Sequence, residues 1–239
     1  MLRRLVLLLT VALALCLAMP AANAGPRGSQ APSAGADCNL PESDADALMI
    51  LNSYYPNRYV WEDTDLTVAV QAKNVSPEYL AAVQEAIEAW DAILRECFDG
   101  QITLTDVTGD KRASADIVLH YVEHAGGAAF GGSAVCGANG CVNVIVSSEF
   151  AGADILYTPE YLYFVTLHEL GHALGLGHST NLAESTDLMG YGWGAEGPDP
   201  VFSQCDLDAI AYLFEPLLSG GEAPGPGPST LEPEFDCAA

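Results

Sequence analysis

Large apolar side chains recur every three or four positions between residues 77 and 97, a spacing that places them on one face of a helix. The members of this stripe are Leu80, Val83, Ile87, Trp90 and Leu94. Ser76 is suited to the N-cap, and a proline and an acid follow it in the first turn. The pattern therefore predicts a helix from Pro77 to about Cys97 with one buried face.

Short runs rich in Val, Ile, Leu and Thr predict strands. They lie at residues 66–70, 102–107, 115–122 and 141–146. Two further helices are indicated by their first residues: one begins with Thr158-Pro159-Glu160 and continues to about Leu174, and the other follows Ser203. The predicted order is strand, helix, several strands, helix, loop and helix.

Both ends of the chain differ from this patterned body, which spans residues 60–216. Residues 1–24 combine two early arginines, an apolar run and the small-residue sequence Ala22-Asn23-Ala24, a pattern typical of a secretory signal peptide. Residues 25–59 are predicted to be a flexible leader and an N-terminal extension, and residues 217–239 a Gly/Pro-rich tail ending near a cysteine. We therefore expect a secreted, extracellular protein.

The charge balance narrows the range of partners. The formal net charge is -24, and removal of the signal would leave 32 acidic side chains against 6 basic ones. Such a surface repels nucleic acid and anionic membranes. The acids could instead serve solubility, calcium binding or the attraction of cationic substrates. No apolar run beyond the signal is long enough for a stable membrane span, and we expect a monomer.

The cysteines indicate disulfide bonds. Of the seven, six remain after the signal is removed, and an exported chain with six thiols is expected to pair them. Fifteen connectivities are then possible. Cys136 and Cys141 flank a Gly-Ala-Asn-Gly turn and are the preferred pair, and Cys237 could tie the tail back to the body.

The stretch HELGHALGLGH, which begins at His168, carries three of the five histidines. His168 and His172 are four residues apart, so a helix would project them from one face. Gly175 could end the helix and turn the chain, which would let His178 approach from outside. Histidines satisfied by local hydrogen bonds are the alternative, but three imidazoles at this spacing favour one catalytic zinc with an open position. Glu169 could then reach a water there without being a ligand.

These residues match at every specified position the signature H-E-x-x-H-x-x-G-x-x-H of the metzincin zinc metallopeptidases, which the chain therefore resembles. Ser179 after the third histidine is similar to the matrixin branch, which contains the matrix metalloproteinases. The resemblance implies that Met189, in the sequence DLMGY, forms a methionine turn as an apolar floor below the metal. Tyr191 resembles the astacin and serralysin pattern, in which a tyrosine approaches the zinc, although packing in the pocket wall is the alternative.

The resemblance also implies the fold and the cleft. The expected fold is α+β, of the metzincin zincin type: a twisted, mixed, mostly parallel sheet with two long helices, the zinc helix at the cleft, and a C-terminal helix. A strand between about residues 128 and 146 is expected to form the upper rim of the cleft and to bind substrate in extended form.

Some features depart from the matrixin pattern. His120 and His124 are too few to complete the second, structural zinc site of many matrixins. Acidic runs make Ca²⁺ possible, but none fits a twelve-residue calcium loop. Cys38 and Pro41 are faintly similar to the prosegment latch, but a disulfide is the alternative for this cysteine.

The predicted function is that of a secreted, zinc-dependent endopeptidase, which hydrolyses a peptide bond by a zinc-bound water with Glu169 as general base. The alternatives are a catalytically idle zinc-binding metzincin domain that binds a protein partner, and a zinc hydrolase acting on a non-peptide amide or ester. Retention of Glu169 argues against the idle domain, because metal binding does not need a base.

Overall fold

The computed structural model describes eleven segments of the chain. These are residues 38, 40–42, 45–50, 61–110, 114–123, 132–136, 142–147, 157–180, 187–190, 199–222 and 234–237. They lie within one compact unit, residues 31–239. The predicted signal peptide, Cys141, His124 and Tyr191 lie outside the described residues.

The first long helix, α1 (Pro77–Cys97), has the predicted bounds and buries four of the five side chains of the predicted stripe, while Leu80 is partly buried. Val83, Ile87, Trp90 and Leu94 are all buried, and three alanines and Ile93 widen the buried face. Ser76 stands at the N-cap position, but its side chain makes no capping hydrogen bond, so that detail of the prediction is wrong.

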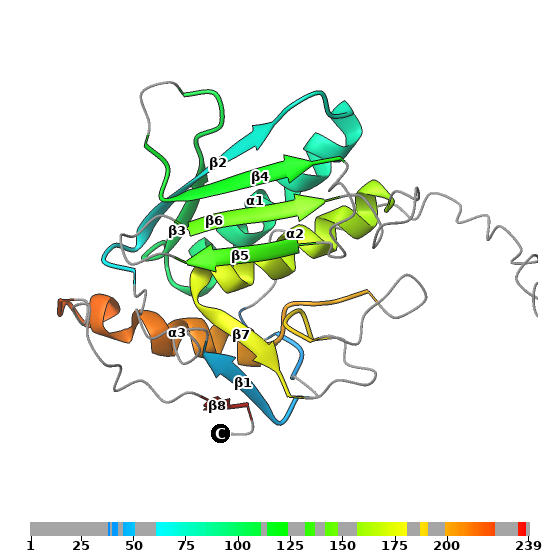
Figure 1. Ribbon diagram of the computed structural model, residues 1–239. Coiled ribbons are helices and arrows are strands. Elements are labelled where there is room, and N and C mark those ends of the chain that lie inside the picture. The colour runs from blue at the N-terminus through cyan, green and yellow to red at the C-terminus, as the bar shows by residue number, and fades with distance from the viewer. Residues whose placement is uncertain are drawn as a thin grey trace, which may run out of the picture. The chain divides into compact units, whose positions relative to one another are not determined.

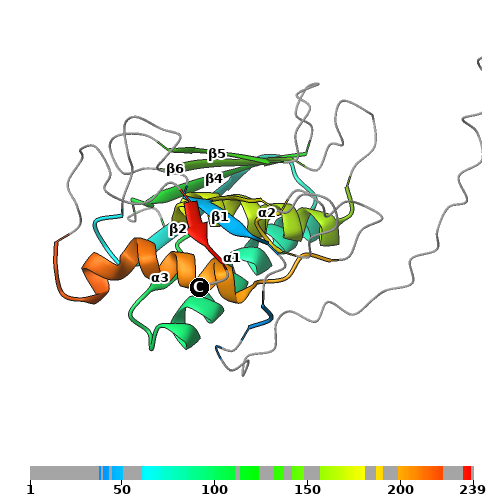
Figure 2. The same ribbon diagram turned by 90° about the horizontal axis from the view of Figure 1, so that it is seen from below.

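A five-stranded sheet lies over the helices. Its strands, in spatial order, are β3 (Thr103–Asp106), β2 (Asp65–Ala72), β4 (Ile117–Val122), β6 (Val142–Ser147) and β5 (Gly132–Cys136). The first four run parallel to one another, and β5 pairs antiparallel with β6 at the edge. Side chains alternate between buried and more exposed along β2 and β4, as expected for strands with one covered face. Figure 2 shows α1 and α2 on the same side of this sheet.

The second helix, α2 (Pro159–Leu174), contains the first two histidines. Its N-cap residue Thr158 accepts a hydrogen bond from the backbone N–H of Tyr161. The helix packs against α1, where the Trp90 indole donates to the carbonyl oxygen of Leu167 at 2.9 Å. Eleven of its residues are buried, so the histidines stand in the interior and not on a solvated face.

A second, three-stranded sheet was not predicted. It has the order β7 (Leu176–Ser179), β1 (Ala47–Ile50) and β8 (Glu234–Asp236), all antiparallel. Figure 1 shows it near α3 (Gln204–Leu218), with α2 between it and the larger sheet. β1, near the start of the described chain, is therefore the central strand and pairs on one edge with β7, which follows the histidine helix, and on the other with β8, near the end of the described chain.

Two disulfides join the ends of the described chain to its helices. Cys38 pairs with Cys97 at the end of α1, and Cys205 in α3 pairs with Cys237 just after β8. Cys38 thus takes the disulfide alternative and not the latch, and the predicted tie of Cys237 to the body is confirmed. The preferred Cys136–Cys141 pair stays a prediction, because Cys141 is outside the described residues.

The observed elements confirm the α+β class, with α1, α2 and α3 at or near their predicted positions. No helix among the described residues is long and apolar enough to cross a membrane.

Candidate metal centre

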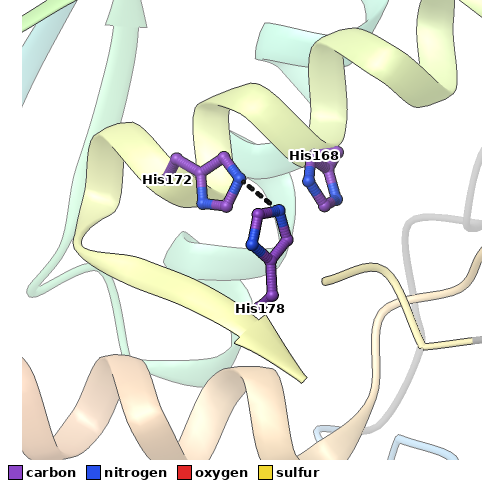
Figure 3. A group of neighbouring side chains, drawn as sticks. All are labelled: His168, His172 and His178. Carbon is purple, nitrogen blue, oxygen red and sulfur yellow. Dashed lines mark hydrogen bonds between the residues drawn. The ribbon is translucent and has the colours of Figure 1, made fainter. Parts of the chain in front are cut away.

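The three histidines of the quoted stretch converge at one point. His168 and His172 project from the same face of α2, and His178 reaches back toward them from β7 (Figure 3). Their candidate ligand nitrogens all lie within 4.8 Å of one another. The distance between His172 Nε2 and His178 Nε2 is 3.1 Å.

The turn at Gly175 brings the third histidine to the first two. Gly175 ends α2 in a left-handed conformation, with φ 112° and ψ 1°, and its N–H reaches the carbonyl oxygens of Gly171 and His172. A side chain at this position would be strained and would also meet the Leu213 side chain, because a Cβ there lies 3.0 Å from Leu213 Cδ1. The glycine therefore sets the direction in which β7 leaves the helix.

Hydrogen bonds to the backbone orient the two helical imidazoles. His168 Nδ1 lies 2.8 Å from the carbonyl oxygen of Leu188, and His172 Nδ1 lies 2.8 Å from that of Leu176. A carbonyl oxygen can only accept, so Nδ1 is the protonated nitrogen in both rings. In the neutral imidazoles, Nε2 therefore carries the free lone pair, and both lone pairs are available at the point of convergence.

The surroundings keep all three imidazoles neutral. Burial, followed by the neighbouring His172, lowers the pKa of His168 to about 3, and the same two causes lower the pKa of His178 to about 3. Burial also lowers the pKa of His172. Neutral imidazole is the form that binds a metal.

Glu169 stands beside the first histidine and is buried, with 7% of its surface exposed. Its Oε2 atom makes no hydrogen bond to any residue that the structure describes. Burial raises the pKa of this carboxyl group to about 8. A cation nearby would favour the ionised form, so the carboxyl is suited to exchange a proton near neutral pH.

Comparison with known proteins agrees with this geometry. The sequence model of the matrixin family matches residues 60–215. The chain belongs to the matrixin family.

Individual relatives give the same assignment. The chain is 27% identical over 188 residues to interstitial collagenase of Bos taurus, an alignment covering 72% of this chain and 36% of the relative. The collagenase of the same name from Sus scrofa is 28% identical over 188 residues, with the same coverage. Interstitial collagenase B of Mus musculus is 44% identical over 55 residues, covering 23% of this chain and 11% of the relative. The chain spans less than half of the length of these relatives.

The donor set of this matrixin fits the zinc ion that the family uses. In a tetrahedral site with Zn–N bonds of 2.0–2.1 Å, ligand nitrogens stand about 3.3 Å apart. The 3.1 Å between the Nε2 atoms of His172 and His178 is close to that spacing. Three converging neutral imidazole nitrogens match a centre with three protein ligands and one open position.

Met189 packs against the helix that carries the first two histidines. It is fully buried, and a Cβ added at Gly171 would lie 2.5 Å from its sulfur atom. Gly171 therefore lets the methionine side chain approach the backbone of α2 closely. Sequence reasoning predicted the methionine turn but overlooked Gly171, which occupies an unspecified position of the signature.

A buried acidic network fastens this turn to α3, and the sequence analysis did not find it. Asp187 accepts from the Met189 N–H at 2.9 Å and from the Ser203 hydroxyl at 3.1 Å. Ser203 and Asp206 form a capping box at the start of α3, and Ser203 Oγ is 3.1 Å from Asp206 Oδ2. The network holds the turn whose Leu188 carbonyl orients His168. The signal was the Ser203…Asp206 spacing, which is typical of a capping box.

Replacing Asp206 by asparagine is expected to change how the stability of this matrixin depends on pH. Burial and then the charge of Asp187 raise the pKa of Asp206 well above its ordinary value, although Ser203 hydrogen bonds lower it. The folded state therefore keeps this proton after the unfolded chain has lost it. The contribution of Asp206 to the free energy of unfolding falls as pH rises from about 4 through the folded pKa.

Denaturant titrations of both proteins between pH 4 and 8 check this sign. The free energy of unfolding of Asp206→Asn, relative to that of the unsubstituted chain, should rise with pH above about 4, by as much as about 1.4 kcal/mol per unit, until the pH reaches the pKa of Asp206 in the folded state. Asparagine can accept from Ser203 as Oδ2 does, so the network should keep its geometry. A difference that does not vary with pH would contradict the raised pKa.

A second expected result concerns Gly175. Gly175→Ala should lower the free energy of unfolding by about 1–3 kcal/mol, because a non-glycine residue is strained at this φ, and it should also weaken zinc binding. Gly109→Ala is the matched control, since Gly109 has φ 86° and a Cβ there meets nothing within 4 Å. Urea denaturation and zinc titration of both variants would test the account. Equal zinc affinity in both variants would contradict the role given to the Gly175 turn.

His120 lies on β4 in the five-stranded sheet and is not part of the histidine group among the described residues. His124 and Tyr191 are outside the described residues, so the role considered for Tyr191 stays a prediction.

Proposed function

We propose that the chain is a secreted, zinc-dependent endopeptidase. The observation that carries the proposal is the convergence of three neutral imidazoles beside a buried carboxyl group whose Oε2 atom lacks a hydrogen-bond partner among the described residues. Membership in the matrixins supports the same reading. His168, His172 and His178 are the proposed ligands of one zinc ion, and Glu169 is the proposed general base.

Each residue of the centre has a part in the proposed hydrolysis. A zinc ion held by the three imidazoles would supply a Lewis acid and lower the pKa of a water molecule. The Glu169 carboxylate takes a proton from the attacking water and later passes it to the nitrogen of the leaving amine. The Leu188 and Leu176 carbonyls keep the helical imidazoles turned with Nε2 toward the reaction centre. Met189 provides an apolar floor, and Gly175 the turn into β7.

A peptide substrate fits the architecture inferred for this centre. We infer a metzincin-type fold in which α2 lies along the cleft and β5 forms its upper rim. In its support, β5 is the last strand of the five-stranded sheet and runs antiparallel to its neighbour. An exposed strand edge can pair with an extended peptide, which would present its scissile bond to the centre.

Export is supported by residues 1–24 and by the disulfides. The first 24 residues have the composition of a signal peptide, and the bonds Cys38–Cys97 and Cys205–Cys237 are of a kind that persists in oxidising compartments. We therefore assign the mature chain to the extracellular space.

The test is cleavage of a quenched peptide library by the purified chain from residue 25 onward. Activity should disappear on chelation and return when one equivalent of zinc is added back. Such a result would also supply the cleavage preference. Zinc bound at one equivalent without cleavage of any peptide would contradict the peptidase and favour the idle, partner-binding domain.

A further inference from the structure

The third histidine depends for its position on a strand pairing outside the helix. His168 and His172 are fixed by α2 itself, whereas His178 lies on β7, which pairs with β1. The register joins Leu48 to Ser179 and Ile50 to Leu176, with an irregularity between them. On its other side, β7 is linked to the methionine turn, because the Ser179 N–H donates to the Met189 carbonyl oxygen at 3.0 Å.

Thr180 fastens the end of β7 to the start of β1. Its N–H donates to the carbonyl oxygen of Ala47 at 2.9 Å, and its hydroxyl accepts from the N–H of Ala47 at 3.0 Å. The same hydroxyl lies 3.2 Å from the Ala47 carbonyl oxygen. These contacts occur two residues after His178, at the end of β7 farther from α2.

The two strands approach unusually closely next to the histidine. A Cβ added at Gly177 would lie 2.5 Å from the carbonyl oxygen of Met49 and 2.9 Å from its Cβ. The backbone of Met49 cannot move aside for an added Cβ as easily as the end of a flexible side chain can. The position of β1 therefore restricts the position of Gly177, the residue before His178.

β1 is itself held from several sides. It pairs with β8 along its other edge, and the N–H of Cys237 donates to the carbonyl oxygen of Asp46 at 3.3 Å. The disulfide Cys205–Cys237 ties the end of β8 to α3, and Cys38–Cys97 ties the residues before β1 to α1. A strand anchored in this way can act as a fixed support for β7.

We propose that β1 positions His178 for metal binding and that Thr180 is the positioning residue through which it does so. The inference rests on the proposed zinc centre. It assigns a role to a segment, residues 47–50, that lies outside the match to the family, residues 60–215. Without the Thr180 contacts, β7 would keep its link to α2 through Gly175 and Leu176. Its other end would be less tightly held, and the position of the His178 Nε2 atom would therefore be less well defined.

The test compares Thr180→Val with Thr180→Ser, which keeps the hydroxyl. Zinc affinity is measured by competition with a chromophoric chelator, and the visible absorption of the Co²⁺-loaded protein reports the ligand geometry. Thr180→Val should bind zinc about 10-fold more weakly and change the Co²⁺ spectrum. Thr180→Ser should stay within about twofold of the unsubstituted chain. Gly177→Ala, which displaces β1 by a different route, should also weaken zinc binding.

Thr67→Val provides the matched control. The hydroxyl of Thr67, on β2, donates to Asp116 and accepts from the Asp116 N–H at 3.1 Å, so its loss removes similar contacts far from the centre. This variant should lose stability without losing zinc affinity. Unchanged zinc affinity and Co²⁺ spectrum in Thr180→Val, or an equal loss of affinity in Thr67→Val, would overturn the inference alone. Failure of the unsubstituted chain to bind zinc would overturn the proposed centre together with it.

Discussion

Replacing Glu169 by glutamine is expected to lower the rate of peptide cleavage by about 100- to 10,000-fold while zinc stays bound. Glutamine has nearly the same shape as glutamate and can occupy the same buried position. Its amide, however, cannot accept the proton of the attacking water. The three imidazoles are unchanged, so the metal affinity should remain close to that of the unsubstituted chain. The measurements are kcat/KM on a peptide found in the library and zinc content after dialysis.

Glu160→Gln is the matched control for this experiment. Glu160 stands in the first turn of the same helix and is exposed, so the same chemical change there should leave kcat/KM within about twofold. If Glu169→Gln retained full activity, Glu169 would not be the base, and the proton would have to pass through another group. If instead it lost its zinc, the carboxyl would have a part in metal binding that the proposal does not give it.

Replacing His178 by alanine is expected to reduce zinc affinity by about 1,000-fold, which corresponds to about 4 kcal/mol. The reason is that one of three nitrogen donors is lost, and the remaining two lie on a single helix and cannot enclose the ion. Cleavage should fall with metal occupancy and recover only in part at high zinc concentration. Competition with a chelator of known affinity measures the change.

His120→Ala is the control for a general effect of removing a histidine. His120 lies on β4, away from the three converging imidazoles, and the alanine variant should bind zinc as the unsubstituted chain does. If both variants lost equal affinity, a metal site other than the proposed one would be indicated.

The sequence predicted well those features that depend on local patterns. The buried stripe of α1, the Thr158 cap of α2 and the strands β2 and β4 are all indicated by residues close to one another in the chain. The same holds for the histidine stretch, because the helix and the turn at Gly175 bring its members together. Local spacing was therefore enough to find the candidate metal centre.

Features that depend on distant partners could not be predicted in this way. β1, β7 and β8 are three or four residues long, and none has enough residues to show a period of its own. Each is a strand because another strand, far away in the sequence, satisfies its backbone hydrogen bonds. Gly171 was overlooked for a similar reason. The need for a glycine there follows from the position of the Met189 side chain, which is distant in the sequence.

The Asp187–Ser203–Asp206 network is a third example. An aspartate in a chain with 32 acidic residues is expected to face solvent, and the sequence alone does not mark those that are buried. Here the network joins the methionine turn to α3 and so supports the carbonyl that orients His168. It connects the C-terminal helix to the metal centre.

The central claim is that His168, His172 and His178 together bind one zinc ion. The most direct test is anomalous diffraction at the zinc edge from crystals of the mature chain loaded with one equivalent of zinc. The account predicts one strong peak about 2.0–2.1 Å from a ring nitrogen of each of the three histidines. No peak there, or a peak held by other residues, would contradict it.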